Sequence, residues 1–69
     1  MEQDYFMSLV EGAIKDLKKK GLSFVFNLEQ VKYIQNKLKD MEINVFNEDG
    51  IYYLSSDKEY TLDIIKAKC

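Results

Sequence analysis

The spacing of apolar residues predicts an amphipathic helix over residues 4 to 20. Apolar positions recur there every three or four residues, which places them on one helical face, while charged residues fall on the other. The helix is expected to end at Gly21, because glycine tolerates the left-handed backbone that commonly follows a helix. Three lysines before it complement the helix dipole. The apolar stripe comprises Phe6, Leu9, Val10, Ala13, Ile14 and Leu17.

A short strand and a second helix are predicted next. Residues 22 to 26 are rich in aromatic and β-branched side chains, and alternation places Phe24 and Phe26 with Leu22 on one side of the pleat. Asn27 suits the position before a helix, with Gln30 three residues later as in a capping box. An apolar stripe at helical spacing then predicts a helix over residues 28 to 41. This stripe comprises Leu28, Val31, Ile34, Leu38 and Met41.

The apolar pattern changes to alternation after residue 41, which predicts a β-hairpin. Ile43 and Val45 share one face of its first strand, and Phe46 lies on the other face. The second strand covers residues 51 to 54. An Asp-Gly step between two apolar runs is a strong signal for the connecting turn, and here it falls at positions 49 and 50.

Residues 55 to 69 fit two different structures. Residues 56 to 59 match a helix capping box, whereas Tyr60, Leu62 and Ile64 alternate as in a strand. A strand is favoured, because in a helix these residues would spread around the circumference without forming a clean stripe.

These elements predict one α+β domain over residues 1–69. Their order is helix, strand, helix, strand, strand and then a strand or helix, with the helices packed on a small mixed sheet. The first strand, second helix and second strand would form a right-handed crossover.

Composition supports a cytoplasmic globular protein. Hydrophobic residues make up 46% of the chain, which is ordinary for a globular domain. Cys69 is the only cysteine, so no intramolecular disulfide is expected, and this favours a reducing compartment. The acidic N-terminus lacks the charge pattern of a signal peptide. No apolar run approaches the roughly 20 residues that cross a bilayer, so we expect no membrane association.

The residue types of common catalytic and metal sites are missing. The chain contains no histidine, which is the usual base beside a nucleophile and a common metal ligand. Cys69 is a poor nucleophile because a terminal residue is rarely held in place. Residues 47 to 50 offer oxygen ligands but lack the length and ligand spacing of a calcium loop. We therefore expect no catalytic residues, no metal, no cofactor and no enzymatic activity.

The basic residues weigh against sequence-specific DNA binding. All ten are lysine, which cannot make the bidentate contacts that arginine makes to guanine. The order helix, strand, helix, hairpin nevertheless resembles that of a winged helix, with residues 43 to 54 as the wing. The resemblance implies a nucleic-acid-binding regulator that uses Lys32, Lys37 and Lys39, although a winged helix normally has a further helix before its wing.

The aromatic residues are the feature that points most directly to a function. The chain has four phenylalanines and five tyrosines, more than one small core is expected to hold. Tyr33 falls on the polar side of the second helix. Val25, Phe46 and one member of the pair Tyr52 and Tyr53 are placed on the sheet face opposite Ile43 and Val45. Either the two helices cover opposite sheet faces, or one face is open to a partner. The candidate interface residues are Val25, Tyr33, Phe46, Tyr52 and Tyr53.

We therefore expect a small non-enzymatic interaction module, a regulator or inhibitor that binds another protein. Its small size and its many lysines, which are common in proteins of AT-rich genomes, suit a phage or mobile-element gene. A homodimer through the same sheet face is expected, because so short a chain without disulfides gains stability by burying more apolar surface. Nucleic-acid binding is the alternative.

Overall fold

The computed structural model describes residues 2–68, so Cys69 lies outside the described residues. Three helices alternate with a strand and a hairpin, and this confirms the predicted α+β order. No helix in this part of the chain combines the length and the apolar character needed to cross a bilayer. The elements are α1 (Glu2–Lys20), β1 (Leu22–Val25), α2 (Leu28–Lys37), β2 (Asn44–Glu48), β3 (Ile51–Ser55) and α3 (Leu62–Lys68).

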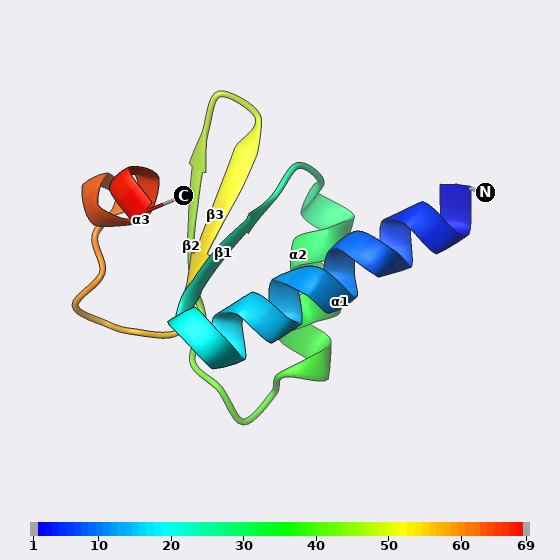
Figure 1. Ribbon diagram of the computed structural model, residues 1–69, viewed down its shortest axis with the longest axis horizontal. Coiled ribbons are helices and arrows are strands. Elements are labelled where there is room, and N and C mark those ends of the chain that lie inside the picture. The colour runs from blue at the N-terminus through cyan, green and yellow to red at the C-terminus, as the bar shows by residue number, and fades with distance from the viewer. Residues whose placement is uncertain (1, 69) are drawn as a thin grey trace.

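The three strands form an antiparallel sheet in the order β1-β3-β2, so the expected mixed sheet is wrong, because both pairs of neighbouring strands are antiparallel. The strands β1 and β2, which α2 connects, run in the same direction, as the expected crossover requires. They are not neighbours, however, because β3 lies between them and pairs antiparallel with each (Figure 1). Both β1 and β2 are therefore edge strands.

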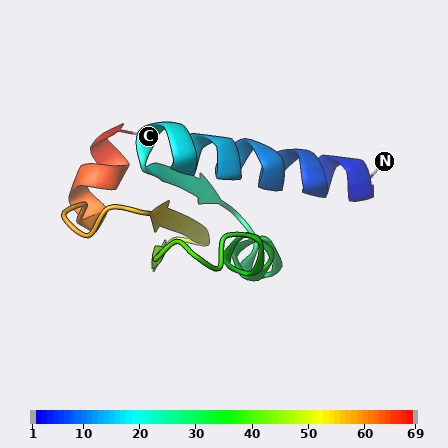
Figure 2. The same cartoon turned by 90° about the horizontal axis from the view of Figure 1, so that it is seen from below.

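The helices are divided unequally between the two faces of the sheet. Side chains of α1 and α2 pack with Val25 and Leu54 of the sheet in one buried cluster, so both helices cover the same face. The third helix, α3, lies on the other side of the sheet (Figures 1 and 2). The first and second helices thus do not cover opposite faces, which was one of the two arrangements considered. The buried cluster comprises Val10, Ala13, Leu17, Val25, Val31, Ile34 and Leu54.

The predicted helix ends and hairpin turn are largely confirmed. Gly21 ends α1 with a positive φ of 81°, and its N–H donates to the carbonyl of Leu17 at 3.0 Å. Asp49 and Gly50 both have positive φ, 53° and 78°, as a tight two-residue hairpin turn requires. Gly50 is the residue type that adopts this conformation without steric cost.

The start of α2 differs from the expected capping box. The side chain of Asn27 accepts a hydrogen bond from the N–H of Glu29 at 2.7 Å, as predicted for a helix cap. Gln30 does not cap the helix. It is buried, and its side-chain amide donates to the carbonyl of Phe6 at 3.3 Å, which ties α2 to α1. The helix ends at Lys37, earlier than residue 41, with Leu38 as its C-terminal cap.

The favoured strand in the C-terminal segment is wrong, because this segment forms α3. Asp57 uses its carboxylate to accept from the N–H of Glu59 at 2.9 Å, so the apparent capping box makes a turn instead. Thr61 then precedes the helix, and its hydroxyl accepts from the N–H of Ile64 at 3.4 Å. The helix buries only Ile65, so it needs no continuous apolar stripe, and Tyr60 lies outside it.

Candidate functional site

The sheet face turned away from α1 and α2, here called the outer face, carries a row of aromatic side chains. Phe24 of β1, Tyr53 of β3 and Phe46 of β2 lie directly opposite one another in the strand register. Residues paired in this way point to the same side of a sheet. The ring of Phe26 stands edge-on to that of Phe24, with 5.5 Å between centroids, and Phe24 lies 6.4 Å from Tyr53. Phe24, Phe26, Phe46 and Tyr53 are hereafter the aromatic cluster.

The aromatic cluster is only partly covered. Phe24 is 41% exposed and Phe26 is 58% exposed, whereas Phe46 and Tyr53 are half-buried. The edge-to-face contact between the rings of Phe24 and Phe26 favours this arrangement of the two side chains. The cluster therefore presents a largely preformed apolar surface to solvent.

The C-terminal segment covers the remainder of the outer face. Ile65 of α3 is fully buried, and α3 lies against β3. At the hairpin the ammonium of Lys66 donates to the carboxylate of Glu48 at 2.8 Å. This hydrogen bond, together with the charge of Glu48, raises the pKa of Lys66 above its ordinary value of 10.5. The helix thus occupies one part of the outer face and leaves the aromatic cluster partly open.

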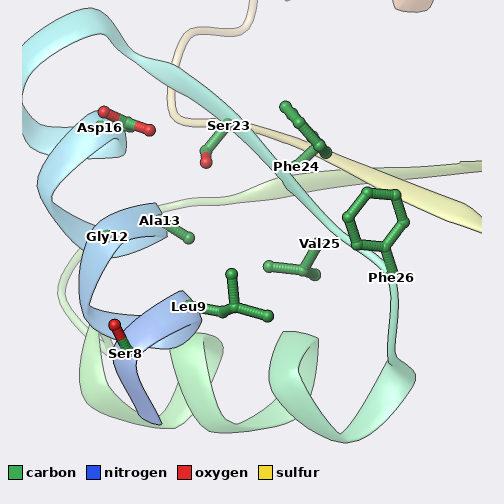
Figure 3. Close-up of a pocket in the computed structure, with 9 residues that line it drawn as sticks. All are labelled: Ser8, Leu9, Gly12, Ala13, Asp16, Ser23, Phe24, Val25 and Phe26. Carbon is green, nitrogen blue, oxygen red and sulfur yellow. The ribbon is translucent and has the colours of Figure 1, made fainter. Parts of the chain in front are cut away.

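A groove of about 250 Å³ adjoins the aromatic cluster, between α1 and β1. Figure 3 shows Leu9, Ala13 and Val25 at its base, with Ser8, Gly12 and Asp16 on the α1 side. Phe24 and Phe26 line the β1 side, so these two residues belong to both the groove and the aromatic cluster. Apart from Asp16 the surroundings are mainly apolar or small.

The structure separates the five predicted interface residues. Phe46 and Tyr53 lie together on the outer face, and Tyr53 is the outward member of the tyrosine pair. Tyr33 is 37% exposed on α2, as predicted, but lies apart from these two. Its ring instead has the ammonium of Lys37 5.8 Å from its centroid.

The sheet face assigned to Val25 is wrong. Val25 is 3% exposed and packs in the core, on the face that also carries Val45. Tyr52 pairs directly with Val25 and packs against the same core. Neither side chain is placed to contact a partner on the outer face, because both point toward α1 and α2. The interface itself stays a prediction for the residues that do face outward.

Sequence reasoning missed Phe24 and Phe26. Alternation grouped them on one side of the predicted strand, but Val25, on the other side, was assigned to the open face. No sequence signal corrects this choice, because both sides of β1 carry apolar residues. The outcome depends on the side of the sheet against which α1 packs, and this is a property of the tertiary structure.

The described residues offer little for metal chemistry. Within residues 2–68, no group of three acidic, histidine or cysteine side chains is arranged to hold a metal ion. The arrangement that stands out is apolar contact surface, formed by the aromatic cluster and the groove beside it.

Comparisons with known proteins found no match among family models, curated proteins or solved structures. The proposals that follow therefore rest on the residues and geometry of this chain.

Proposed function

We propose that this chain is a small non-enzymatic interaction protein that binds another protein through the aromatic cluster. The observation that carries the proposal is the partial exposure of four aromatic side chains on one part of the sheet. Aromatic residues are enriched at protein interfaces, because each contributes a large contact area.

The arrangement of the cluster favours binding. The backbone positions of Phe24, Tyr53 and Phe46 are set by strand pairing, and the ring of Phe26 packs against that of Phe24. Side chains that are already ordered lose less conformational entropy when a partner covers them. The cluster is therefore suited to contribute a few strong contacts at the centre of an interface.

A regulator or inhibitor acts by occupying a surface on its target, and this role needs no catalytic group of its own. The single cysteine favours a cytoplasmic setting, and the lysine-only basic residues suit a phage or mobile-element gene in an AT-rich genome. These features support the proposed role.

A second copy of the chain is the competing occupant of the cluster. A two-fold dimer of ordinary size buries about 800 Å² on each partner. The surface of this chain is 4979 Å², so a dimer would cover about a sixth of it. Light scattering separates the two occupants, because a self-associating chain exceeds a mass of 8.1 kDa as its concentration rises.

Affinity capture from a lysate of cells that carry the gene tests the proposal. We expect Tyr53→Thr to reduce capture of the partner at least tenfold, because it removes an aromatic ring and keeps a residue that favours strands. Tyr5→Thr is the matched control, since Tyr5 is 69% exposed on α1 and lies outside the cluster. Equal capture by both variants, or no stoichiometric partner with the unchanged chain, would contradict the proposal.

Nucleic-acid binding through Lys32, Lys37 and Lys39 stays a prediction that no specific contact favours. Only α2 separates β1 from β2, so the further helix of a winged helix is missing at that place. A polarisation assay with mixed-sequence duplex at about 50 mM salt tests it, because lysine contacts to phosphate are strongest at low salt. Absence of binding there removes this alternative.

A further inference from the structure

We propose that the groove between α1 and β1 binds an extended peptide segment, which adds to the sheet as a fourth strand along β1. The inference rests on the proposed function and specifies where a partner binds and in which conformation. Three observations carry it: unpaired backbone groups at the edge of β1, open space along α1, and a carboxylate on the groove wall.

The backbone of β1 has hydrogen-bonding groups directed away from the sheet. Within residues 2–68, β3 is the only strand that pairs with β1. The N–H of Ser56 donates to the carbonyl of Gly21 at 2.9 Å, so Gly21 and Ser56 are a hydrogen-bonded pair just beyond the ends of β1 and β3. Bonding alternates along an antiparallel strand. Ser23 and Val25 therefore bond to β3, and the N–H and carbonyl of Phe24 face the free edge.

The α1 side of the groove is open because its residues are small. Ser8, Gly12 and Asp16 are spaced four residues apart and lie on one side of the helix. A Cβ atom built on Gly12 would have no atom within 4 Å, so the space beside it is free. An apolar side chain entering here would contact Leu9 and Val25 at the base of the groove.

Asp16 gives the groove a preference for a positively charged side chain in the bound segment. Its side chain is half-buried on the groove wall. Neither ion pair found among the described residues includes it. Alternate side chains of a strand point to the same side. A matching segment therefore carries a lysine or arginine toward Asp16 and an apolar residue, two positions away, toward the base of the groove.

An extended segment fits this edge better than a second folded copy. Pairing with a second copy would bring that copy's own α1 to the joined edge, whereas a peptide brings no helix with it. Antiparallel pairing of two β1 strands would bring both α1 helices to the same side of the joined sheet. A single extended peptide needs only the groove.

The probe is the synthetic peptide acetyl-Thr-Lys-Thr-Val-Thr-Val-Thr-amide, whose lysine and valines share one side when extended. We expect amide NMR shifts in the unmodified chain confined to residues 8–16 and 22–26. At a peptide concentration ten times Kd, exchange of the Phe24 amide should slow about tenfold. Replacing the peptide lysine with glutamate should weaken binding at least tenfold. No shift in these two segments at about 5 mM peptide would overturn the proposal.

Backbone methylation of the peptide tests strand addition itself. Two versions carry N-methyl groups either at the odd or at the even residues. Because only alternate residues of an added strand bond to β1, one version should lose binding and the other should retain it. Equal binding of both versions would show that the peptide does not add as a strand.

A variant of α1 tests the groove without weakening the fold. Gly12→Leu fills the open space and should raise Kd for the peptide at least tenfold, while the better helix former keeps the chain folded. Glu11→Leu adds the same side chain at an exposed position that does not line the groove, and Kd should stay within about twofold. Unchanged binding by Gly12→Leu would overturn the proposal.

Failure of this inference is distinguishable from failure of the proposed function. If the captured cellular partner is lost with Tyr53→Thr but retained equally by Gly12→Leu, the aromatic cluster binds the partner and the groove does not. Peptide shifts confined to Phe46 and Tyr53 would lead to the same conclusion.

Discussion

The two faces of the sheet carry apolar side chains of different kinds and bury them to different extents. On the inner face, Val25 and Leu54 are enclosed by two helices. On the outer face, Phe24 is large but 41% exposed, and α3 contributes only Ile65 as a buried side chain. Burial of apolar area, rather than the presence of apolar residues, stabilises a fold. The inner face therefore accounts for most of the stability, and the outer face has apolar surface available for a partner.

The largest expected effect is on the inner face. Leu54→Ala should lower the free energy of unfolding by roughly 2–5 kcal/mol, because it leaves a cavity under two helices. A domain of this size has only about 3–5 kcal/mol in total, so the variant should lose a large part of its stability at 25 °C. Urea unfolding followed by circular dichroism measures the loss. A loss under about 1 kcal/mol would show that the inner face is not the main core.

A smaller and more local effect is expected from Ile65, the one fully buried contact of α3. Ile65→Ala should release α3, because a helix of seven residues is not stable without packing. Amides of α3 should then exchange with solvent much faster than those of β3, as measured by hydrogen exchange. If the α3 amides stay as protected as those of β3, the helix is held by more than this side chain.

Replacing glycine with alanine should change the free energy of unfolding in opposite directions at Gly21, which ends α1, and at Gly12, beside the open groove. Gly21→Ala should cost roughly 1–2 kcal/mol, because φ is 81° there and alanine disfavours that backbone. Gly12→Ala should raise the free energy of unfolding by about 0.5–1 kcal/mol, since the helix improves and no atom obstructs the new methyl group. Thermal unfolding of both variants tests this, and a destabilising Gly12→Ala would mean that the groove is not open.

The smallest effect concerns the ion pair that links α3 to the hairpin. The folded-state pKa of Lys66 is raised, so its contribution is fully present below the ordinary value of 10.5 and is lost as pH rises through the higher folded value. The difference in stability between Lys66→Met and the unchanged chain should therefore disappear at high pH.

Lys58→Met is the matched control, because Lys58 forms an ion pair with Glu42 at 3.2 Å with both side chains almost fully exposed. It should change stability less than Lys66→Met does at neutral pH. A Lys66→Met difference that persists to about pH 12 would assign the effect to packing of the side chain.

The sequence predicted most of the fold because its signals were local. The helical spacing of apolar residues and the position of Gly21 located α1, and Asp49 with Gly50 located the hairpin turn. The C-terminal helix was missed because it buries one residue and so leaves almost no periodic pattern. Its start depends on Thr61, while the apparent capping box at residues 56 to 59 forms a turn.

The candidate site was only partly predictable, because it depends on which sheet face the helices cover. Phe46 and Tyr53 were assigned to the outer face, but Val25 was placed there in place of Phe24. Both sides of β1 are apolar, so alternation groups its residues without saying which group is buried. The groove needs α1 and β1 side by side, and no residue pattern in either element specifies that distance.

The most direct test of the division between the faces is the free energy of unfolding of Phe24→Ala measured beside that of Leu54→Ala. Side-chain size alone ranks the phenylalanine substitution as the more costly, at about 3–5 kcal/mol in a core. Because Phe24 is partly exposed, we predict a loss of about 1 kcal/mol, well below that of Leu54→Ala. A loss for Phe24→Ala equal to or above that of Leu54→Ala would show that the outer face belongs to the core, and the account would be contradicted.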